Sequence, residues 1–374
     1  MTSRSAAEQE ALDRRFMAAA IRLSGKHAGL TATNPSVATL IVRESPDGPV
    51  IVGRGVTAIG GRPHAETEAL AEAGALARGA TAYVTLEPCA HHGRTPPCAN
   101  ALVSAGVARV VGAASDPDSR VSGKGYAIIR DAGIEVVDRI LAGQAADAMA
   151  GYLTRSLKKR PEVTLKLAIS QDGMIGKPGE GQVAITGEVS RRQVHMMRSE
   201  SDAILVGVGT AIADDPELTV RLPGLADRSP TRIVLDPTAR LPLASKLVQT
   251  ASQDALLVAV CEGADPARKA ALERMGVGFL ATETFDGRIA LPELLEDLAA
   301  KGMSTVMVEG GAATARHFLE DGLVDRIVLF RGAVVVGQDG IAAPVDENRM
   351  PAGFSLVRQA IFGDDHVSEW VRPL

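Results

Sequence analysis

Four residues within a stretch of 35 restrict the possible structure of this chain more than any other feature. Two of them belong to the sequence His64-Ala-Glu66, and the other two, Cys89 and Cys98, each follow a proline. One imidazole and two thiolates provide three ligands for a zinc ion. Structural zinc sites are closed by four protein ligands, whereas catalytic sites keep the fourth position for water. The pattern therefore predicts one zinc ion per chain.

Glu66 lies two residues after the first ligand and can move a proton to and from a water molecule. A His/Cys/Cys zinc site with a glutamate that is not a ligand is typical of base deaminases, whose usual signature ends in Pro-Cys-x-x-Cys. Here eight residues, Ala90 to Pro97, separate the cysteines. This insert either supplies His91 or His92 as the fourth ligand of a structural zinc, or forms a substrate loop over an open zinc. Glu66 favours the open site, because a structural site needs no carboxylate beside its first ligand.

Length and composition predict two domains and a small-molecule partner. A chain of 374 residues is too long for one ordinary domain. Apolar residues make up 46% but aromatic residues only 3%, so Ala, Val, Ile and Leu must build the cores. The formal net charge is −5, and no basic run is present. Nucleic acids require clustered Lys and Arg or aromatic stacking platforms, so we expect no nucleic-acid partner.

Cysteine use and apolar patterning predict a cytoplasmic protein. Two of the three cysteines are assigned to zinc, and Cys261 lies in an apolar run typical of a buried strand. This use suits a reducing compartment rather than a disulfide framework. The N-terminus is charged and has no apolar signal core, and no apolar stretch approaches the roughly 20 residues that cross a bilayer. We therefore expect no membrane partner.

The first part of the chain alternates helices and strands, as in an α/β sheet covered on both faces. A Pro-Asp-Gly turn at 46–48 predicts a hairpin. Helices should begin at His64 and near Pro97, and both helix starts favour thiolate over thiol. We expect helices over 7–25 and 64–78 and from 97 onward, and strands over 37–42, 50–56, 80–86 and 108–113.

The domain boundary should fall within 145–162, where a helical pattern ends in Lys-Lys-Arg-Pro. The predicted domains are therefore 1–150 and 160–374. A second α/β pattern follows, with a helix over 188–200. Its predicted strands are 163–170, 203–209, 231–236, 255–261, 305–310 and 325–330.

Two glycine segments of the second domain are candidates for phosphate binding. The sequence GVG at 207–209 follows an apolar strand like the start of a dinucleotide fingerprint, but Asp236 fits the expected acidic position poorly. The sequence EGG at 309–311 opens a predicted helix, where glycine lets backbone N–H groups approach a phosphate. The alternative is that these glycines only form tight turns. Polar groups that could hold a sugar phosphate lie between the segments or just before them: Arg198, Asp214, Asp215 and Arg221.

Together these motifs resemble the bifunctional riboflavin-biosynthesis deaminase/reductase family, over roughly residues 10–345. The run TLEPC-x-HHGRTPPC at 85–98 is the most specific of them, and it accounts for the long spacing between the cysteines. The other matching runs are Asn34-Pro35, His64-Ala-Glu66, LKLAIS-x-DG (165–173), ITG (185–187), ADDP-x-LTVR (213–221) and VEGG (308–311).

The resemblance implies a cytidine-deaminase-like α/β/α domain followed by a dihydrofolate-reductase-like α/β domain. The first would use zinc to remove the 2-amino group of 2,5-diamino-6-ribosylamino-4(3H)-pyrimidinone 5′-phosphate by hydrolysis. The second would use NADPH to reduce 5-amino-6-(5-phosphoribosylamino)uracil to the ribitylamino product. Because that fold is not a Rossmann fold, the GVG segment is then interpreted as a turn at a strand end. An intermediate shared by two sites also favours a homo-oligomer, either a dimer or a tetramer.

The resemblance assigns a role to each matching residue. Glu66 is implied to be catalytic, and the zinc ligands are His64, Cys89 and Cys98. The implied deaminase substrate positions are Asn34, His91, Arg94 and Asp116. The implied reductase substrate positions are Gln182, Arg198, Leu218, Arg221 and Glu309. The implied cofactor positions are Ala168, Thr210, Asp214, Gly311, Ala312, Ala313, Thr314, Ala315, Arg316 and His317.

The chain departs from the family pattern at three places. Ser36-Val37-Ala38 replaces a usual Val-Gly after Asn34-Pro35, Ala184 replaces a frequent Trp, and Val334 replaces a lysine. The last two changes concern the reductase half. A second hypothesis is therefore a zinc deaminase for another base or nucleoside whose second domain only binds a nucleotide. A third is a regulatory module with a closed zinc site.

Overall fold

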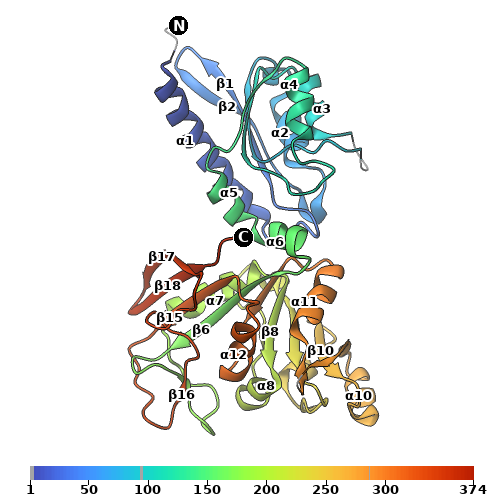
Figure 1. The fold of residues 1–374 in the computed structure, drawn as a ribbon, viewed down its shortest axis with the longest axis vertical. Helices are drawn as coiled ribbons and strands as arrows, with labels where there is room; N and C mark the ends of the chain where they lie inside the picture. The colour runs from blue at the N-terminus through green and yellow to red at the C-terminus, as the bar shows by residue number, and fades with distance from the viewer. Residues whose placement is uncertain (1–3, 93–95, 286) are drawn as a thin grey trace. The chain divides into compact units, whose positions relative to one another are not determined.

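The computed structural model describes residues 4–92, 96–285 and 287–374 (Figure 1). The described chain divides into two compact units, Met1–Lys158 and Lys159–Leu374. The helix that ends at Lys158 thus belongs to the first unit, eight residues beyond the end of the predicted domain 1–150. Among the described residues, none of the helices combines the length and the hydropathy that a membrane span requires.

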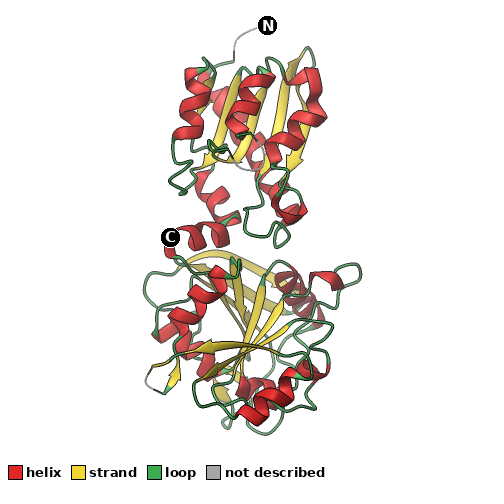
Figure 2. Cartoon of the chain, turned by 90° about the vertical axis from the view of Figure 1, so that its right-hand side faces the viewer, coloured by secondary structure: helices red, strands yellow, loops and turns green. Residues whose placement is uncertain are grey.

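The first unit has three layers, with helices on both faces of a sheet (Figures 1 and 2). In its described residues the sheet has the order β2-β1-β3-β4-β5, in which β1 is antiparallel to β2 and β3, and β3, β4 and β5 are parallel. Helices α1 and α5 contact one another on one face, and α2, α3 and α4 follow one another on the other. The strands are β1 (Ala38–Ser45), β2 (Gly48–Val56), β3 (Thr81–Leu86), β4 (Arg109–Ala114) and β5 (Glu135–Val137). The helices are α1 (Ala6–Ser24), α2 (Ala65–Ala73), α3 (Cys98–Ala105), α4 (Lys124–Asp131), α5 (Ala142–Ala148) and α6 (Ala150–Lys158).

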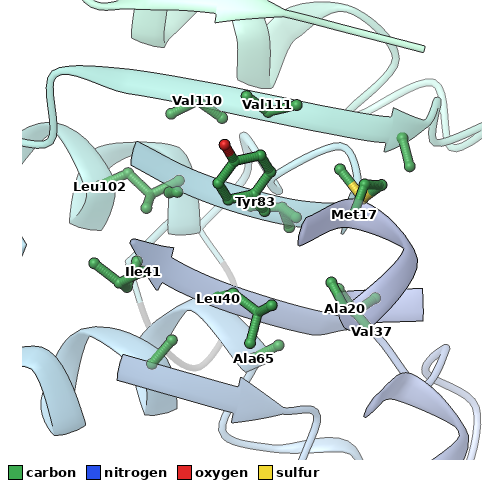
Figure 3. Close-up of a cluster of buried hydrophobic side chains, with 14 of the residues drawn as sticks. Met17, Ala20, Val37, Leu40, Ile41, Ala65, Tyr83, Leu102, Val110 and Val111 are labelled. Atoms are coloured by element: carbon green, nitrogen blue, oxygen red, sulfur yellow. The ribbon is translucent and has the colours of Figure 1, made fainter. Parts of the chain in front are cut away.

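Small and branched side chains build the core of this unit, as the low aromatic content requires. Figure 3 shows Met17 and Ala20 of α1 with Leu40 of β1 and Val110 of β4 in one buried cluster. Tyr83 is one of the few aromatic side chains in it. Most of the surface removed from water is therefore contributed by many small residues, each of which buries little area by itself.

Helix α2 lies directly on β2 because two glycines leave room for its backbone. A Cβ atom at Gly53 would lie 2.2 Å from the carbonyl oxygen of Ala69, and one at Gly55 would lie 2.1 Å from that of Ala65. Both glycines are on the same side of β2, since side chains alternate along a strand. This close approach fixes α2, and with it the N-cap residue His64, against β2.

The second unit is built on one large sheet with a mixed pattern of strands. Its order, for the residues described, is β11-β10-β9-β8-β14-β6-β15-β18-β17. Strand β18 runs antiparallel to both of its neighbours, β15 and β17, and the other pairs in this sheet are parallel. The strands are β6 (Glu162–Ile169), β8 (Ala203–Gly207), β9 (Thr231–Leu235), β10 (Leu256–Cys261), β11 (Gly278–Thr282), β14 (Thr305–Val308), β15 (Arg326–Arg331), β17 (Ser355–Phe362) and β18 (Asp365–Val371). Two short pairs, β7 (Met174–Gly176) with β16 (Ile341–Ala342) and β12 (Thr284–Phe285) with β13 (Arg288–Ile289), lie outside it.

Alternate residues of the central strands pack against different helices, as the period of a strand requires. Leu205 and Ile233 belong to the cluster that contains residues of α11 and α12. Their neighbours Ile204 and Val234 belong to the cluster that contains residues of α8, α9 and α10. The helices are α7 (Glu188–Ser199), α8 (Val208–Asp214), α9 (Lys246–Gln249), α10 (Pro266–Glu273), α11 (Leu291–Ala300) and α12 (Ala312–Glu320).

Several predicted elements end or divide differently in the structure. The strand predicted over 203–209 ends at Gly207, because α8 begins immediately at Val208. The helix predicted over 64–78 ends at Ala73, and a 3-10 turn continues from it. The helical pattern within 145–162 forms two helices, α5 and α6, because Met149 has the non-helical φ of −122°.

Candidate functional site

The three predicted metal ligands converge from three elements of the first unit. His64 is the N-cap of α2, Cys98 is the first residue of α3, and Cys89 follows the end of β3. Within the described parts of the chain they form the group able to hold a metal ion, with all ligand atoms within 4.8 Å of one another. Neither His91 nor His92 joins this group. The described residues therefore provide three ligands and leave a fourth position open.

The distances between the ligand atoms fit a zinc ion. His64 Nδ1 lies 3.7 Å from Cys89 Sγ and 3.4 Å from Cys98 Sγ. Tetrahedral coordination with Zn–N of about 2.0–2.1 Å and Zn–S of about 2.3 Å separates nitrogen and sulfur by about 3.6 Å. The imidazole nitrogen thus already lies at about the distance from each sulfur that a shared zinc ion requires.

The site combines a stabilised thiolate with a buried carboxyl group. The hydrogen bond with the Cys98 thiol, together with those from His64 and the Cys98 backbone, lowers the pKa of Cys89 to about 4. The backbone N–H of Cys98 lies 3.2 Å from Cys89 Sγ, at the positive end of α3. Burial, with the nearby charge of Cys89, raises the pKa of Glu66 to about 6. Glu66 is therefore a proton acceptor held out of water, next to the metal ligands and outside the ligand group.

Glu87 anchors the segment that carries Cys89, although the sequence pattern did not single it out. Its carboxylate accepts hydrogen bonds from the backbone N–H groups of Gly123 and Gly125, at 3.0 and 3.1 Å. Gly125 is needed there, because its Cβ atom would lie 1.9 Å from the carbonyl oxygen of Pro88. The N-terminus of α4 thus holds the Glu87-Pro88-Cys89 segment in place.

The positions that the resemblance assigns to the deaminase substrate lie on loops of this unit. Asn34 donates from Nδ2 to the carbonyl oxygen of Gly61, 3.0 Å away and three residues before His64. Asp116 follows β4, is buried, and lies near enough to Cys89 for the two charges to interact. His91 is half-buried in the insert. Arg94 falls within 93–95, outside the described residues.

A second polar cluster lies in the second unit, beside the middle of β6 and the end of β14. Arg198 of α7 forms a bidentate ion pair with Glu309, with distances of 2.6 and 3.0 Å. Lys166 of β6 points to the same carboxylate, with Nζ 3.8 Å from Oε2. Burial favours the protonated form of Glu309, but the charges of Arg198 and Lys166 outweigh it and lower the pKa. Burial also lowers the pKa of Lys166.

Helix α7 also holds the loop that contains Leu218 and Arg221. Arg198 Nη1 donates to the carbonyl oxygen of Thr219 at 3.1 Å, and the N–H of Arg221 donates to His195 Nδ1 at 3.3 Å. The side chain of Leu218 is buried in an apolar cluster, and its backbone has a positive φ of 59°. Leu218 can therefore reach a ligand only through its backbone, whereas the side chain of Arg221 is half exposed.

Lys166 and His195 were not predicted from the sequence. Lys166 does carry a signal, since it is the one basic residue within the apolar run VTLKLAI. His195 lies three residues before Arg198 on α7, on the same side of the helix. That spacing becomes informative only when Arg198 is known to face the site.

The predicted cofactor positions gather where α8 and α12 begin. Thr210 Oγ1 accepts the N–H of Gly311 at 2.9 Å, and a Cβ atom at Gly207 would lie 2.3 Å from Thr314 Oγ1. Strands β8 and β14 are hydrogen-bonded neighbours, so the two helix N-termini share one edge of the sheet. The first turn of α12 presents N–H groups that a helix leaves unsatisfied, which fits the phosphates of a dinucleotide.

The remaining cofactor and substrate positions differ in exposure. Ala315 is buried in the core beneath α12, so its side chain is turned away from any ligand. Ala168, Ala312, Asp214 and His317 are half-buried, and Ala313, Arg316 and Gln182 are exposed. His317 forms a contact of 3.5 Å with Asp321.

The three positions at which the chain departs from the family pattern lie in different environments. Ala38 is buried at the start of β1 and donates its N–H to Thr85 Oγ1 at 3.0 Å. Ala184 is exposed. The carbonyl oxygen of Val334 accepts the N–H of Gln171 at 2.8 Å. Val334 makes this contact through its backbone.

Comparison with family models defines the class of each unit. Residues 10–114 match the model described as the zinc-binding region of cytidine and deoxycytidylate deaminases. Residues 161–365 match the RibD C-terminal domain. Fold and site together therefore define a zinc-dependent deaminase unit joined to a reductase unit.

Curated relatives and solved structures extend over both units. The chain is 39% identical to the riboflavin biosynthesis protein RibD of Aquifex aeolicus over 327 residues, which is 87% of this chain and 88% of that protein. It is 35% identical to RibD of Escherichia coli over 338 residues, 87% of this chain and 89% of that protein. The structure of Acinetobacter baumannii RibD matches with a TM-score of 0.83 and 34% identity, covering 98% of this chain and all of that one.

A Thermotoga maritima structure matches with a TM-score of 0.82 and 30% identity over 98% of this chain and 100% of that one. It is described as a diaminohydroxyphosphoribosylaminopyrimidine deaminase/5-amino-6-(5-phosphoribosylamino)uracil reductase. The chain belongs to the RibD family of bifunctional deaminase/reductases of riboflavin biosynthesis. The predicted fold class, a cytidine-deaminase-like unit followed by a dihydrofolate-reductase-like unit, is confirmed, and so are the implied cofactors, zinc and NADPH.

Proposed function

We propose that residues 1–150 form a deaminase domain that hydrolyses 2,5-diamino-6-ribosylamino-4(3H)-pyrimidinone 5′-phosphate. We propose further that residues 160–374 reduce the product, 5-amino-6-(5-phosphoribosylamino)uracil, to its ribitylamino form with NADPH. The observation that carries the first activity is the set of three ligand atoms with the spacing of a zinc site, beside the buried carboxyl group of Glu66.

In the deaminase, Glu66 is the proton carrier. When bound, zinc acidifies a coordinated water and so supplies a nucleophile at neutral pH. The Glu66 carboxylate would accept the proton of that water and deliver it to the ring nitrogen, and would then carry the proton of the added hydroxyl group to the departing amine, which leaves as ammonia. Asn34, His91, Arg94 and Asp116 bind the ring and the ribosyl phosphate.

In the reductase, the cluster around Glu309 orients the sugar. When bound, NADPH supplies the hydride, and the protein contributes position and electrostatics. Hydride addition to the anomeric carbon breaks its bond to the ring oxygen of the sugar. Lys166 is a buried ammonium group held by Glu309, so it can donate the proton that this oxygen takes up. The remaining substrate contacts are assigned to Gln182, Arg198, Leu218 and Arg221. The cofactor contacts are assigned to Ala168, Thr210, Asp214, Gly311, Ala312, Ala313, Thr314, Ala315, Arg316 and His317.

The protein acts as a homo-oligomer in the cytoplasm. An edge strand, β17, supports assembly with a second copy, because it exposes Leu356, Val357 and Ile361 beside an unpaired row of backbone groups. The free thiols of Cys89, Cys98 and Cys261 suit a reducing compartment. Sedimentation analysis of the purified protein gives the oligomeric state directly.

The test of the function is coupled turnover by the full chain, loaded with zinc and supplied with NADPH. Incubation with the diaminopyrimidinone phosphate should release one ammonia and oxidise one NADPH per product, with absorbance lost at 340 nm. The product mass should correspond to the ribitylamino compound. Release of ammonia from a free nucleoside instead would favour another deaminase, and deamination without NADPH oxidation would reduce the second unit to a binding domain.

A further inference from the structure

Helix α6 contacts two separate loops that carry proposed substrate residues. Tyr152 Oη donates a hydrogen bond of 2.9 Å to Asp116 Oδ1. Arg155 Nη2 donates to the carbonyl oxygen of Thr33, the residue before Asn34. Residues three apart lie on one face of a helix, with Cβ atoms about 5–6 Å apart. The same face of α6 therefore holds both loops.

The bonds to Asp116 leave one of its oxygens available. Oδ1 accepts both from Tyr152 and from the N–H of Asp118, each at 2.9 Å. Both of these side-chain hydrogen bonds, which lie within the described part of the chain, end on Oδ1, so Oδ2 is available to a ligand. An ionised carboxylate repels a phosphate but accepts readily from a hydroxyl group. Of the two groups that the ribosyl phosphate offers, a sugar hydroxyl rather than the phosphate therefore suits Oδ2.

Side chains form three of the hydrogen bonds that hold the loop before Asn34. Thr31 Oγ1 donates to the carbonyl oxygen of Asn34 at 2.7 Å, and Asn34 Nδ2 donates to the carbonyl oxygen of Gly61 at 3.0 Å. Arg155 supplies the third bond, to Thr33, and it is the only one of the three that comes from α6. Without Arg155 the loop keeps its local bonds but loses its link to the helix that also holds Asp116.

We propose that Tyr152 and Arg155 are positioning residues of the deaminase, which set the separation between Asn34 and Asp116 and aim Asp116 Oδ2 at a hydroxyl of the ribosyl group. The proposal rests on the proposed function. It adds that recognition of the sugar depends on α6, a helix whose residues took no part in the sequence-based assignment.

The test compares Tyr152→Phe with Tyr126→Phe. Both variants lose one phenolic hydroxyl from a tyrosine of the same unit, but that of Tyr126 is buried and has no hydrogen-bond partner among the residues that the structure describes. A hydrogen bond to a charged group is worth about a factor of ten or more in binding. Tyr152→Phe should therefore raise KM for deamination about tenfold, with kcat, zinc content and melting temperature close to the wild type. Tyr126→Phe should leave KM unchanged.

A substrate lacking the sugar hydroxyls separates positioning from general structural damage. With a 2′,3′-dideoxyribosyl analogue, Tyr152→Phe and the wild type should have the same KM, because the group that Asp116 binds is absent. Asp116→Asn should raise KM by itself, and adding Tyr152→Phe to it should change little, since the two residues act as a unit. Arg155→Met should raise KM several-fold, with Arg130→Met, an exposed arginine of α4, as its control.

The inference is overturned if Tyr152→Phe has the KM of the wild type, or raises KM equally for both substrates. If the wild type deaminates a different nucleoside, the proposed function fails, and the KM ratios measured with that nucleoside and its dideoxy form decide the inference. A wild type with no deaminase activity overturns both.

Discussion

Arg198 Nε lies 2.6 Å from Glu309 Oε1, and Arg198 Nη2 lies 3.0 Å from Glu309 Oε2, although 111 residues separate the two in sequence. The pair joins α7 to the end of β14 and places both residues beside Lys166. A planar guanidinium can form this bidentate contact, and an ammonium group cannot. The ion pair thus fixes the orientation of the carboxylate in the proposed reductase site.

Replacing Arg198 with Lys should impair reduction while leaving deamination intact. The variant keeps the positive charge but loses the second hydrogen bond to Glu309 and the bond to Thr219. We expect kcat/KM for NADPH oxidation to fall about 10- to 100-fold, as for the loss of a hydrogen bond to a charged group. Arg192→Lys, which alters an exposed ion pair on the same helix, is the control. Equal rates for the two variants, measured at 340 nm, would contradict the assignment.

Replacing Glu66 with Gln should abolish deamination without loss of metal. Glutamine fills the same space but carries no proton between water and substrate, so kcat should fall about 10²- to 10⁴-fold. Zinc content by elemental analysis should match the wild type, because Glu66 is outside the ligand group. Glu68→Gln, an exposed change on the same helix, should have no effect. Ammonia release at the wild-type rate would refute the catalytic role.

Replacing Glu87 with Gln should weaken zinc binding. A glutamine can accept one of the two backbone hydrogen bonds from Gly123 and Gly125, but its amide NH₂ opposes the other N–H. Supporting residues around a metal site typically contribute 10- to 100-fold to affinity, so we expect about a tenfold loss. Competition with a chromogenic chelator measures the zinc affinity of the variant. Glu72→Gln, an exposed glutamate of α2, should keep the affinity of the wild type.

Replacing Gly55 with Ala should destabilise the first unit. The new methyl group would lie 2.1 Å from the carbonyl oxygen of Ala65, so α2 must move away from β2. Overpacking of this kind costs about 1–3 kcal/mol, and the shift should also lower zinc affinity because His64 precedes α2. Gly143→Ala adds a methyl group into open space and should be neutral or stabilising. Urea denaturation compares the stability of the two variants. Equal denaturation midpoints would show that the close contact between α2 and β2 is unimportant for stability.

The buried pair of Asp13 and Arg109 should make the first unit sensitive to acid. Burial opposes ionisation of Asp13, but hydrogen bonds from Arg109, Tyr83 and Gln9 outweigh it and lower the pKa. The folded-state pKa is thus below the value of about 3.9 in the unfolded chain. The stabilisation is full above about pH 4 and is lost as the pH falls through the folded-state pKa.

Asp13→Asn should reduce this acid dependence. At pH 7 it should also cost about 3–5 kcal/mol, because the neutral amide leaves the charge of Arg109 without its buried partner. Circular dichroism with urea at pH 7 and below pH 4 measures both effects. Asp131→Asn, at an exposed aspartate, should follow the wild type at every pH. If Asp13→Asn lost as much stability at low pH as the wild type does, other carboxylates would dominate the acid sensitivity.

Much of the architecture could be predicted from local patterns. Apolar runs bounded by turns marked the buried strands, since a strand covered on both faces has to be apolar throughout. The predictions were less accurate where one element passes directly into another, as at Gly207 and Val208, because Val208 begins a helix although a β-branched residue favours a strand. The C-terminal hairpin of β17 and β18 was missed, since β17 exposes most of its residues and lacks a buried pattern.

The sequence by itself determined the metal centre and the family. Zinc accepts few donor types, so a histidine, two cysteines and a nearby glutamate in a short stretch already specify the chemistry. Only the tertiary structure decided what surrounds those residues: Tyr152 on Asp116, Arg155 on the Asn34 loop, and Lys166 beside Glu309. Each of these contacts joins segments that are far apart along the chain and carry no shared local pattern. They exist because sheet order and helix packing bring the segments together, and neither is encoded at any single position.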